Sequence, residues 1–212
     1  MKRLSFAIIM CLISTVFSTA AIAQEWAFDV YLDKNKIGKH TFTLDENKLL
    51  TSRAKFNVKV LFINAYKYDH DSKEQWKDNC LSNIEVNTTE NKVVTNVKGV
   101  KTAAGFEVTD GKTKQTLPEC TMTFAYWNPK ILDQKQLLNP QNAEYLTTAF
   151  NKLANETITV KGQPTETKHY TLKGALGGKS KLNIELWYNF SGDWVALKST
   201  TPEGYVINYK LK

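Results

Sequence analysis

The stretch from residue 26 to residue 44, WAFDVYLDKNKIGKHTFTL, decides the fold class. In its first part large apolar side chains recur at every second position, the period that a β-strand imposes on its two faces: Trp26, Phe28, Val30 and Leu32. The four residues DKNK at 33–36 are typical of a turn, and the alternation resumes at His40, Phe42 and Leu44. The stretch therefore predicts two neighbouring antiparallel strands, each with one buried face.

The same alternation returns along most of the chain. Residues 53–60 place apolar side chains on one face and charged or amide side chains on the other. Glycines separate further segments of this kind, near residues 81–88, 92–100, 156–161, 167–173, 181–188, 194–200 and 205–211. We predict a mainly β domain over residues 24–212, with ten or eleven strands in a curved antiparallel sheet or half-open barrel.

Residues 124–154 do not follow this pattern. Asn128-Pro129 is typical of a helix start, with Asn as the N-cap and Pro in the first turn, and predicts a short helix or irregular crossover over residues 129–138. Beyond it, the apolar spacing at 145–153 fits a helix, whereas the threonines there favour a strand. The residues alone leave the structure of 140–154 open.

The composition excludes several classes of protein. The chain has 212 residues, 42% of them apolar and 11% aromatic, with a formal net charge of +7. A chain this rich in apolar and aromatic residues can bury enough surface to fold, and its 10 glycines and 3 cysteines fit neither a collagen nor a disulfide-dense scaffold. Lysines and acidic residues mostly alternate along the strands, which is typical of a solvated face, and no nucleic-acid partner is expected.

The N-terminal residues have the pattern of a secretory signal peptide. Lys2 and Arg3 precede an apolar run from Leu4 to about Phe17, and Ala21-Ile22-Ala23 is a small-residue cleavage site. We predict that residues 1–23 are removed after Ala23. The run is too short for a membrane anchor, and no later segment is long and apolar enough to span a bilayer, so no transmembrane anchor is expected after cleavage. The predicted location is the periplasm.

Cys80 and Cys120 are the cysteines that remain after cleavage. In an oxidising compartment they are expected to form one disulfide. The bond would close a loop of about 41 residues, for which the chain-entropy estimate is roughly 4 kcal/mol of stability. A redox or metal site has little support, because the cysteines are far apart in sequence and no histidine lies near them.

The segment AYKYDHDSKEQW at residues 65–76 is the most unusual in the chain. Read as a strand, it places only polar side chains on one face: Lys67, Asp69, Asp71, Lys73 and Gln75. The other face carries Tyr66, Tyr68, His70, Ser72, Glu74 and Trp76. The large aromatics indicate that this second face points inward, and it carries His70 and Glu74 with it.

A buried imidazole or carboxylate needs a partner, because burying it alone costs free energy. His70 and Glu74 lie about 13 Å apart along a strand and cannot touch, whereas His40, on the same face as Phe42, could supply a partner. One interpretation is a polar cluster in an apolar cavity that orients a ligand headgroup. The alternative is a satisfied polar network that fixes the strand register.

A metal site at Asp69, His70, Asp71 and Glu74 is a further alternative, but the two aspartates face away from the other side chains on a strand. We therefore predict no metal and no cofactor. The chain contains no G-x-S-x-G elbow, P-loop or H-E-x-x-H motif. A hydrolase that uses Glu74 and His70 remains the least favoured function, and no catalytic residue is assigned.

Aromatic residues form a second group at FAYWNP, residues 124–129. They either pack in the core or form a lid or rim over a cavity. Tyr126 and Trp127 are included among the candidate ligand-binding residues on the second interpretation.

Several motifs together resemble a secreted bacterial family of unknown function, DUF6134. They are W-x-F-x-V-x-L-D at 26–33, I-G-x-H-x-F at 37–42, Y-x-Y-D-H-D-x-x-E-x-W at 66–76, Cys80-Leu81, FAYWNP at 124–129, LLNPQ at 137–141 and LWY at 186–188. A more distant likeness links it to periplasmic lipoprotein-carrier proteins, whose curved antiparallel sheet partly wraps an apolar hollow. This resemblance implies the same fold and favours a strand at 144–153, but it brings no established activity.

We expect a periplasmic binding or carrier protein for an apolar or lipid-like ligand. The candidate ligand-binding residues are Tyr66, Tyr68, His70, Glu74, Trp76, His40, Tyr126 and Trp127. The alternative is an envelope module that docks a protein partner through exposed aromatics and binds no small molecule.

Overall fold

The computed structural model describes residues 23–60, 63–201 and 204–212. Fifteen β-strands and one short 3-10 helix (η1) occur in these residues. In chain order they are β1 Gln24–Leu32, β2 Asn35–Leu44, β3 Leu49–Val60, β4 Ile63–Lys77, β5 Cys80–Glu90, β6 Val93–Thr102, β7 Gly105–Thr109, β8 Lys114–Leu117, η1 Pro129–Asp133, β9 Gln136–Leu138, β10 Tyr145–Lys152, β11 Glu156–Val160, β12 Gln163–Leu176, β13 Lys179–Asn189, β14 Trp194–Thr200 and β15 Val206–Leu211.

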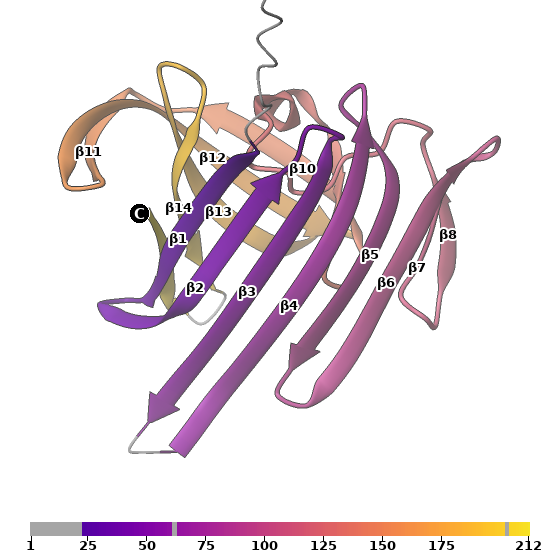
Figure 1. Ribbon diagram of the computed structural model, residues 1–212, viewed down its shortest axis with the longest axis horizontal. Helices are drawn as coiled ribbons and strands as arrows, with labels where there is room; N and C mark the ends of the chain where they lie inside the picture. The colour runs from indigo at the N-terminus through magenta and orange to yellow at the C-terminus, as the bar shows by residue number, and fades with distance from the viewer. Residues whose placement is uncertain (1–22, 61–62, 202–203) are drawn as a thin grey trace, which may run out of the picture.

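The strands form one antiparallel sheet that curls without closing into a barrel. Its order is β8-β7-β6-β5-β4-β3-β2-β1-β15-β14-β13-β12-β10-β9, and β11 pairs with β12 outside this path. In Figure 1 the strands β1 to β6 form a broad front wall, and β12 and β13 pass behind it. The pairing of β1 with β15, which sets Phe28 against Leu211, joins the two ends of the chain in the middle of the sheet.

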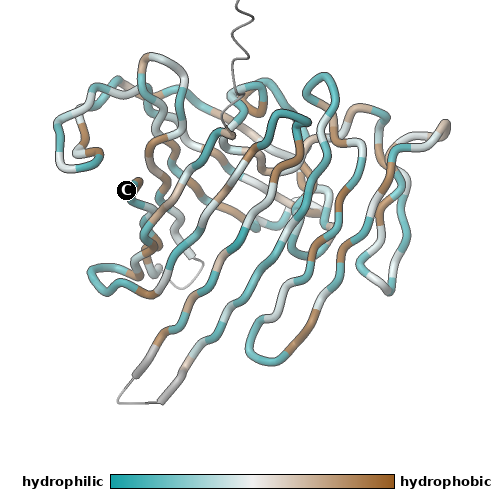
Figure 2. Tube along the Cα trace, in the orientation of Figure 1, coloured by the Kyte–Doolittle hydropathy of each residue, from teal (hydrophilic) through white to brown (hydrophobic). Residues whose placement is uncertain are grey.

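The alternation of the sequence determines which face of each strand is buried. Trp26, Phe28 and Val30 of β1 are buried, and their neighbours on the same strand keep accessible surface. Figure 2 shows this pattern as hydrophobic residues interspersed with hydrophilic ones along the strands. The apolar side chains gather on the concave face, which we call the inner face.

An irregular stretch, residues 118–135, passes through the concave side and is called here the crossing segment. Its start is fixed by the disulfide from Cys80 to Cys120 and by the Leu81 N–H, which donates to the Thr121 carbonyl. Its end leads through η1, which Asn128 caps by accepting from the backbone N–H of Lys130. The segment thus bridges the β5 side of the sheet and β9, where Leu138 N–H donates to the Met122 carbonyl.

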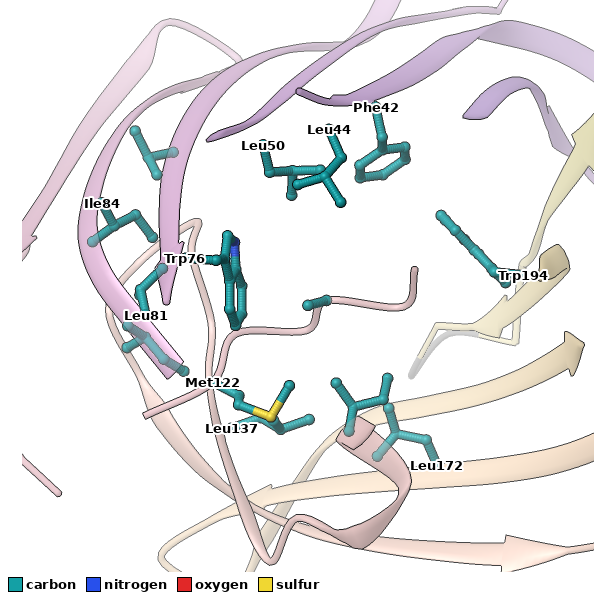
Figure 3. Close-up of a cluster of buried hydrophobic side chains, with 14 of the residues drawn as sticks. Phe42, Leu44, Leu50, Trp76, Leu81, Ile84, Met122, Leu137, Leu172 and Trp194 are labelled. Atoms are coloured by element: carbon teal, nitrogen blue, oxygen red, sulfur yellow. The ribbon is translucent and has the colours of Figure 1, made fainter. Parts of the chain in front are cut away.

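The crossing segment brings apolar side chains into the core. Met122 and Ala125 are buried there among residues from both walls. In Figure 3 Trp76, Leu50, Phe42, Trp194 and Leu172 point toward a common centre, and an irregular piece of chain runs between them. This end of the half-barrel is therefore filled with side chains.

The structure confirms the predicted fold class and corrects some elements. The predicted helix over 129–138 is confined to Pro129–Asp133, and Gln136–Leu138 forms a strand instead because it pairs with β10. The strand at 145–152 confirms the expectation from the resemblance. There are fifteen strands rather than ten or eleven in the described residues, because short strands such as β7, β8 and β9 carry too little alternation to be recognised.

The predicted Cys80–Cys120 disulfide is present, with a Cα–Cα distance of 4.8 Å. The predicted signal peptide lies outside the described residues, apart from Ala23. In the part of the chain that the structure covers, no helix has the length and apolar character needed to span a membrane.

Gly38 is the glycine with the least room for a side chain. It lies beside a β-bulge in β2, and a Cβ at this position would stand 1.9 Å from the Lys55 carbonyl oxygen. Since that atom belongs to a paired backbone, we expect Gly38→Ala to lower the free energy of unfolding by about 2 kcal/mol or more. Urea denaturation followed by tryptophan fluorescence measures the change. Gly99→Ala, whose nearest contact is the Phe106 side chain at 2.7 Å rather than a backbone atom at 1.9 Å, should cost less; an equal or larger loss there would contradict this ranking.

Candidate functional site

The inner face of β4 carries the candidate site. Its side chains alternate as predicted: Tyr68, His70, Ser72, Glu74 and Trp76 are buried, and Tyr66 is half-buried. On the opposite face, Asp69 pairs with Lys55 and Asp71 pairs with Arg53. A strand with one apolar and one charged face therefore turns its two ionisable inner groups, His70 and Glu74, into the concave side.

The strand register arranges the inner face in three levels. At the end filled by the crossing segment, Leu44, Leu50, Glu74 and Ile84 lie opposite one another on successive strands. In the middle, the register aligns His40, Ala54, His70 and Thr88, with Ser52 and Ser72 beside them. At the far end, Phe56 lies opposite Tyr68, and Tyr209 of β15 lies opposite Val30. The face thus changes from apolar, through polar, to aromatic.

Hydroxyl groups lie within hydrogen-bond distance of both ring nitrogens of His40 and of Nδ1 of His70. His40 Nε2 lies 2.7 Å from Ser52 Oγ, and its Nδ1 lies 3.2 Å from Tyr209 Oη. His70 Nδ1 lies 2.9 Å from Thr88 Oγ1. The two imidazole rings are 6.3 Å apart across the small side chain of Ala54. His40 is therefore a neighbour of His70 rather than its hydrogen-bond partner.

Both histidines are held in the neutral form. Burial lowers the pKa of His40 well below its usual 6.5, and the nearby His70 lowers it further. Burial also lowers the pKa of His70 to about 4, against a weaker opposing effect of Asp71 and Asp69. At neutral pH this level offers hydrogen bonds but no positive charge.

Glu74 belongs to the apolar level, where it is 4% exposed. Burial raises its pKa to about 7, although hydrogen bonds from Thr123 and Ser72 oppose this shift. Thr123 Oγ1 donates to Oε2 at 2.9 Å, and Ser72 Oγ donates to Oε1 at 3.3 Å. Because Thr123 belongs to the crossing segment, Glu74 connects that segment to β4.

Stacked rings line the aromatic level. The Tyr68 ring lies 5.2 Å from Phe56, 6.4 Å from Tyr66 and 6.0 Å from His70, with interplanar angles of at most 14°. Tyr209 meets Phe56 edge-on at 6.4 Å. Phe56, Tyr66 and Tyr209 keep accessible surface. We call Phe56, Tyr66, Tyr68 and Tyr209 the aromatic ladder.

The other candidate residues lie apart from the ladder. Trp76 is 4% exposed at the filled end and meets Trp127 edge-on at 5.5 Å. Trp127 also lies 6.3 Å from Trp26, and it is partly buried against the core. Tyr126 packs on Trp194 at 5.2 Å, and Tyr188 Oη donates to its carbonyl oxygen. The structure thus brings together His40, Tyr66, Tyr68 and His70, with Glu74 one level deeper.

The four side chains considered for a metal site do not converge. Asp69 and Asp71 are engaged with cations on the outer face, and His70 and Glu74 point inward. Over the described ranges, no group of three or more His, Cys, Asp or Glu side chains is arranged to hold a metal ion.

Sequence reasoning missed Tyr209, Ser52, Thr88 and Thr123 as parts of this site. Ser52 and Thr88 each occupy an inner position next to apolar ones, at Leu50 and Val86. The sequence signal for these two residues was a small hydroxyl side chain at an inner position, where the alternation predicts an apolar one. Nothing in the sequence placed Tyr209 beside His40, because that contact depends on β15 joining β1.

A solved structure shares this architecture. The chain is similar to the β-barrel-like protein of the domain of unknown function DUF1849 from Brucella abortus, with a TM-score of 0.66 and 11% sequence identity. The match covers 91% of this chain and 96% of that one, and because the identity is only 11% it supports the fold alone. No protein among the curated ones matches the sequence. The model of the domain of unknown function DUF6134 matches residues 28–212, as the sequence motifs predicted, and the chain belongs to this family.

Proposed function

We propose that the protein is a periplasmic binding or carrier protein whose aromatic ladder holds an apolar or lipid-like ligand. The observation that carries the proposal is the ladder itself, on the concave face. Phe56, Tyr66 and Tyr68 stack with near-parallel rings, and all members of the ladder except Tyr68 keep accessible surface. Proteins rarely leave several aromatic side chains together in contact with water unless these bind something. Aromatic rings supply large apolar contact areas with few rotatable bonds.

The polar level beside the ladder restricts the chemistry of the ligand. His40 and His70 are neutral at pH 7, and burial raises the pKa of Tyr68 and of Tyr209 above the ordinary tyrosine value. These groups form hydrogen bonds without carrying charge. The ligand that suits them has an apolar body and an uncharged polar group, such as a hydroxyl, ester or amide.

The periplasmic location rests on the disulfide and on the N-terminal sequence. Disulfides persist in oxidising compartments, and the Cys80–Cys120 bond fixes the crossing segment against β5. The pattern at residues 1–23 has the charged start, apolar run and small-residue site of a cleaved signal. Native mass spectrometry of protein purified from the periplasm would give both the mature N-terminus and any bound molecule.

The alternative functions have less support. Trp127 is partly buried against Trp26 and Trp76, so it offers only part of its ring for docking a protein. For a hydrolase, Glu74 and His70 would have to act on one substrate, but each is hydrogen-bonded to its own hydroxyl groups on separate levels of the sheet. Neither arrangement resembles a nucleophile aligned with its base.

Binding of N-phenyl-1-naphthylamine, an uncharged apolar fluorophore, tests the proposal in the mature protein. We expect saturable binding at neutral pH, with Phe56→Ala/Tyr66→Ala weakening it by roughly tenfold because two partly exposed rings are lost. Tyr68→Asp should abolish binding, because it places a charge among the rings. Lys67→Asp changes the charge on the outer face of the same strand and serves as the matched control.

If Tyr68→Asp fails to fold, Phe56→Ala/Tyr66→Ala still tests the proposal, because both side chains are only half-buried. Circular dichroism and the urea midpoint establish that each variant is folded. Equal affinity in the wild type and in folded Phe56→Ala/Tyr66→Ala would overturn the proposal. So would the absence of both probe binding and a lipid-sized adduct in native mass spectra.

A further inference from the structure

The hairpin of β5 and β6 ends in residues 90–94, which we call the β5–β6 tip. It carries the two most exposed large apolar side chains of the described residues: Val93 is 68% exposed and Val94 is 56% exposed. In Figure 1 the tip lies at the lower edge of the front wall, where β3 ends and β4 begins. Figure 2 shows a hydrophobic segment of β6 directly beside the hydrophilic turn. Adjacent apolar side chains beside a turn, where polar residues are usual, indicate an interaction surface.

The two valines lie on opposite faces of the sheet. Val93 is on the inner face, two positions before Thr95 and four before the buried Val97. Val94 is on the outer face, where the next position along β6 is the exposed Asn96. A protein partner that docks on a sheet covers one face of it. Apolar surface on both faces of one tip therefore suits a medium that surrounds the tip, which is what the boundary region of a lipid bilayer does.

Hydrogen bonds to β4 hold the tip in place. Asn91 and Lys92 form the two-residue turn, with φ angles of 46° and 76°. The Asn91 N–H donates to the Lys67 carbonyl oxygen at 2.9 Å, and Asn91 Oδ1 accepts from the Lys67 N–H at 2.9 Å. The valines are thus presented by a preformed turn, which reduces the entropy lost on binding.

The tip also carries positive charge. Lys92 in the turn and Lys67 beside it are exposed, and Glu90 is the acidic residue of the tip. Glycine is the residue that the left-handed conformation at position 92 favours, so a lysine there costs some stability and places an ammonium group at the end of the hairpin. Long lysine side chains reach lipid phosphates while neighbouring apolar groups lie deeper. These charges favour an anionic lipid surface.

The sheet edge beside the tip continues the apolar surface. Through β5, the strand register sets Val93 in one row with Phe56 and Tyr68 of the aromatic ladder. In the next row toward the edge, Val58 lies opposite Tyr66, and both keep accessible surface. Accessible apolar side chains therefore extend from the tip along the same edge of the front wall.

We propose that the β5–β6 tip docks the protein on the surface of an anionic phospholipid bilayer. Val93 and Val94 enter the boundary between headgroups and acyl chains, and Lys67 and Lys92 contact lipid phosphates. The docking goes beyond the proposed function and does not require the aromatic ladder to hold a ligand. One consequence does rest on the proposed function: the docked protein turns the ladder toward the bilayer, so an apolar ligand passes between them without crossing water.

Co-sedimentation of the mature protein with lipid vesicles tests the docking. One set of vesicles is phosphatidylcholine, and the other contains about one third phosphatidylglycerol. We expect binding to the anionic vesicles to be at least about fivefold tighter, because each lysine near an anionic surface strengthens binding several-fold. The difference should shrink as salt rises, because both lysines are exposed.

Val93→Thr/Val94→Thr keeps the shape and β-branching of both side chains and adds two hydroxyls. It should weaken binding to the anionic vesicles by about tenfold or more. Val100→Thr makes the same change at a 47% exposed valine further along β6 and is the matched control, expected to bind like the wild type. Lys67→Gln/Lys92→Gln should remove the preference for anionic vesicles, whereas Lys98→Gln/Lys114→Gln should keep it.

Undiminished binding of folded Val93→Thr/Val94→Thr, or an equal loss in Val100→Thr, would overturn the proposal. So would a wild type that binds neither set of vesicles. Sedimentation velocity without lipid covers the other occupant: a dimer that Val93→Thr/Val94→Thr abolishes would assign the valines to a second copy of the chain instead. Binding of N-phenyl-1-naphthylamine without vesicles should be the same in this variant and the wild type, so a failure of the docking and a failure of the ladder are distinguishable.

Discussion

Replacing both disulfide cysteines, as Cys80→Ala/Cys120→Ala, is expected to lower the free energy of unfolding by about 4 kcal/mol. The bond joins residues 40 positions apart, and its loss frees a long loop in the unfolded chain. It also releases one end of the crossing segment, which carries Met122 and Ala125 into the core. For a domain whose total stability is about 5–15 kcal/mol, this is a large share. Urea denaturation of the wild type and of the double variant measures it.

Hydrogen bonds also hold the crossing segment to the β4–β5 region. Variants at these bonds show how much of the stability comes from the disulfide itself. Thr121 accepts from Leu81, and Asn128 Nδ2 donates to Asn79 Oδ1, both beside the β4–β5 turn. Asn128→Ala should cost only about 1 kcal/mol, because it removes a helix cap and one side-chain contact. A double cysteine variant as stable as the wild type would show that these contacts alone hold the segment. Reduction of the wild-type protein with dithiothreitol should reproduce the loss.

The alternation of the sequence was sufficient to predict the long strands and their buried faces. At residues 26–32 and 66–76 it correctly separated inner from outer side chains, because burial on one face of a sheet imposes a period of two. It failed at β7, β8 and β9, which have five, four and three residues. Strands this short are determined by the partners they meet, which are distant in the sequence.

The candidate site was predictable along β4 and not across the sheet. The inner positions of Tyr66, Tyr68, His70 and Glu74 follow from one strand, whereas their partners come from other strands and from the crossing segment. Those contacts depend on register, which the sequence pattern fixes only to within two residues. The sequence left open whether His40 is a partner of His70; in the structure His40 reaches Ser52 and Tyr209 instead.

A groove on the outer face of the sheet, lined by Asp29, Lys161, Trp187 and Lys210 among others, had no signal in the sequence. Asp29, Lys161 and Lys210 looked like ordinary solvated residues, and Trp187 looked like part of the core. Their proximity results from β1 pairing with β15 and from the outward curl of the β11–β12 hairpin.

The buried Glu74 and His70 should each make the free energy of unfolding depend on pH, in opposite directions. The pKa of Glu74 is raised from 4.5 to about 7, so its favourable contribution is complete below pH 4.5 and is lost as pH rises through 7. The pKa of His70 is lowered from 6.5 to about 4, so its contribution is complete above pH 6.5 and is lost as pH falls through 4. Each shift corresponds to about 3 kcal/mol. The two effects oppose each other between pH 4.5 and 6.5, and single variants are needed to separate them.

Glu74→Gln removes the titrating carboxyl while keeping an oxygen that accepts from Thr123. Between pH 4.5 and pH 8 we expect the free energy of unfolding of this variant to gain about 3 kcal/mol relative to the wild type, because only the wild type must bury a charge at high pH. His70→Gln should show the reverse trend, gaining a similar amount between pH 7.5 and pH 4.

Glu85→Gln, which removes an exposed carboxyl from the outer face of β5, is the control for the loss of one surface charge. Urea midpoints measured between pH 4.5 and pH 8 test this expectation. If the difference in free energy of unfolding between Glu74→Gln and the wild type stays constant with pH, the buried carboxyl does not titrate in this range. Any fall in stability between pH 4.5 and pH 7 would then need another group, and Glu74 would serve only to hold Thr123 and the crossing segment against β4.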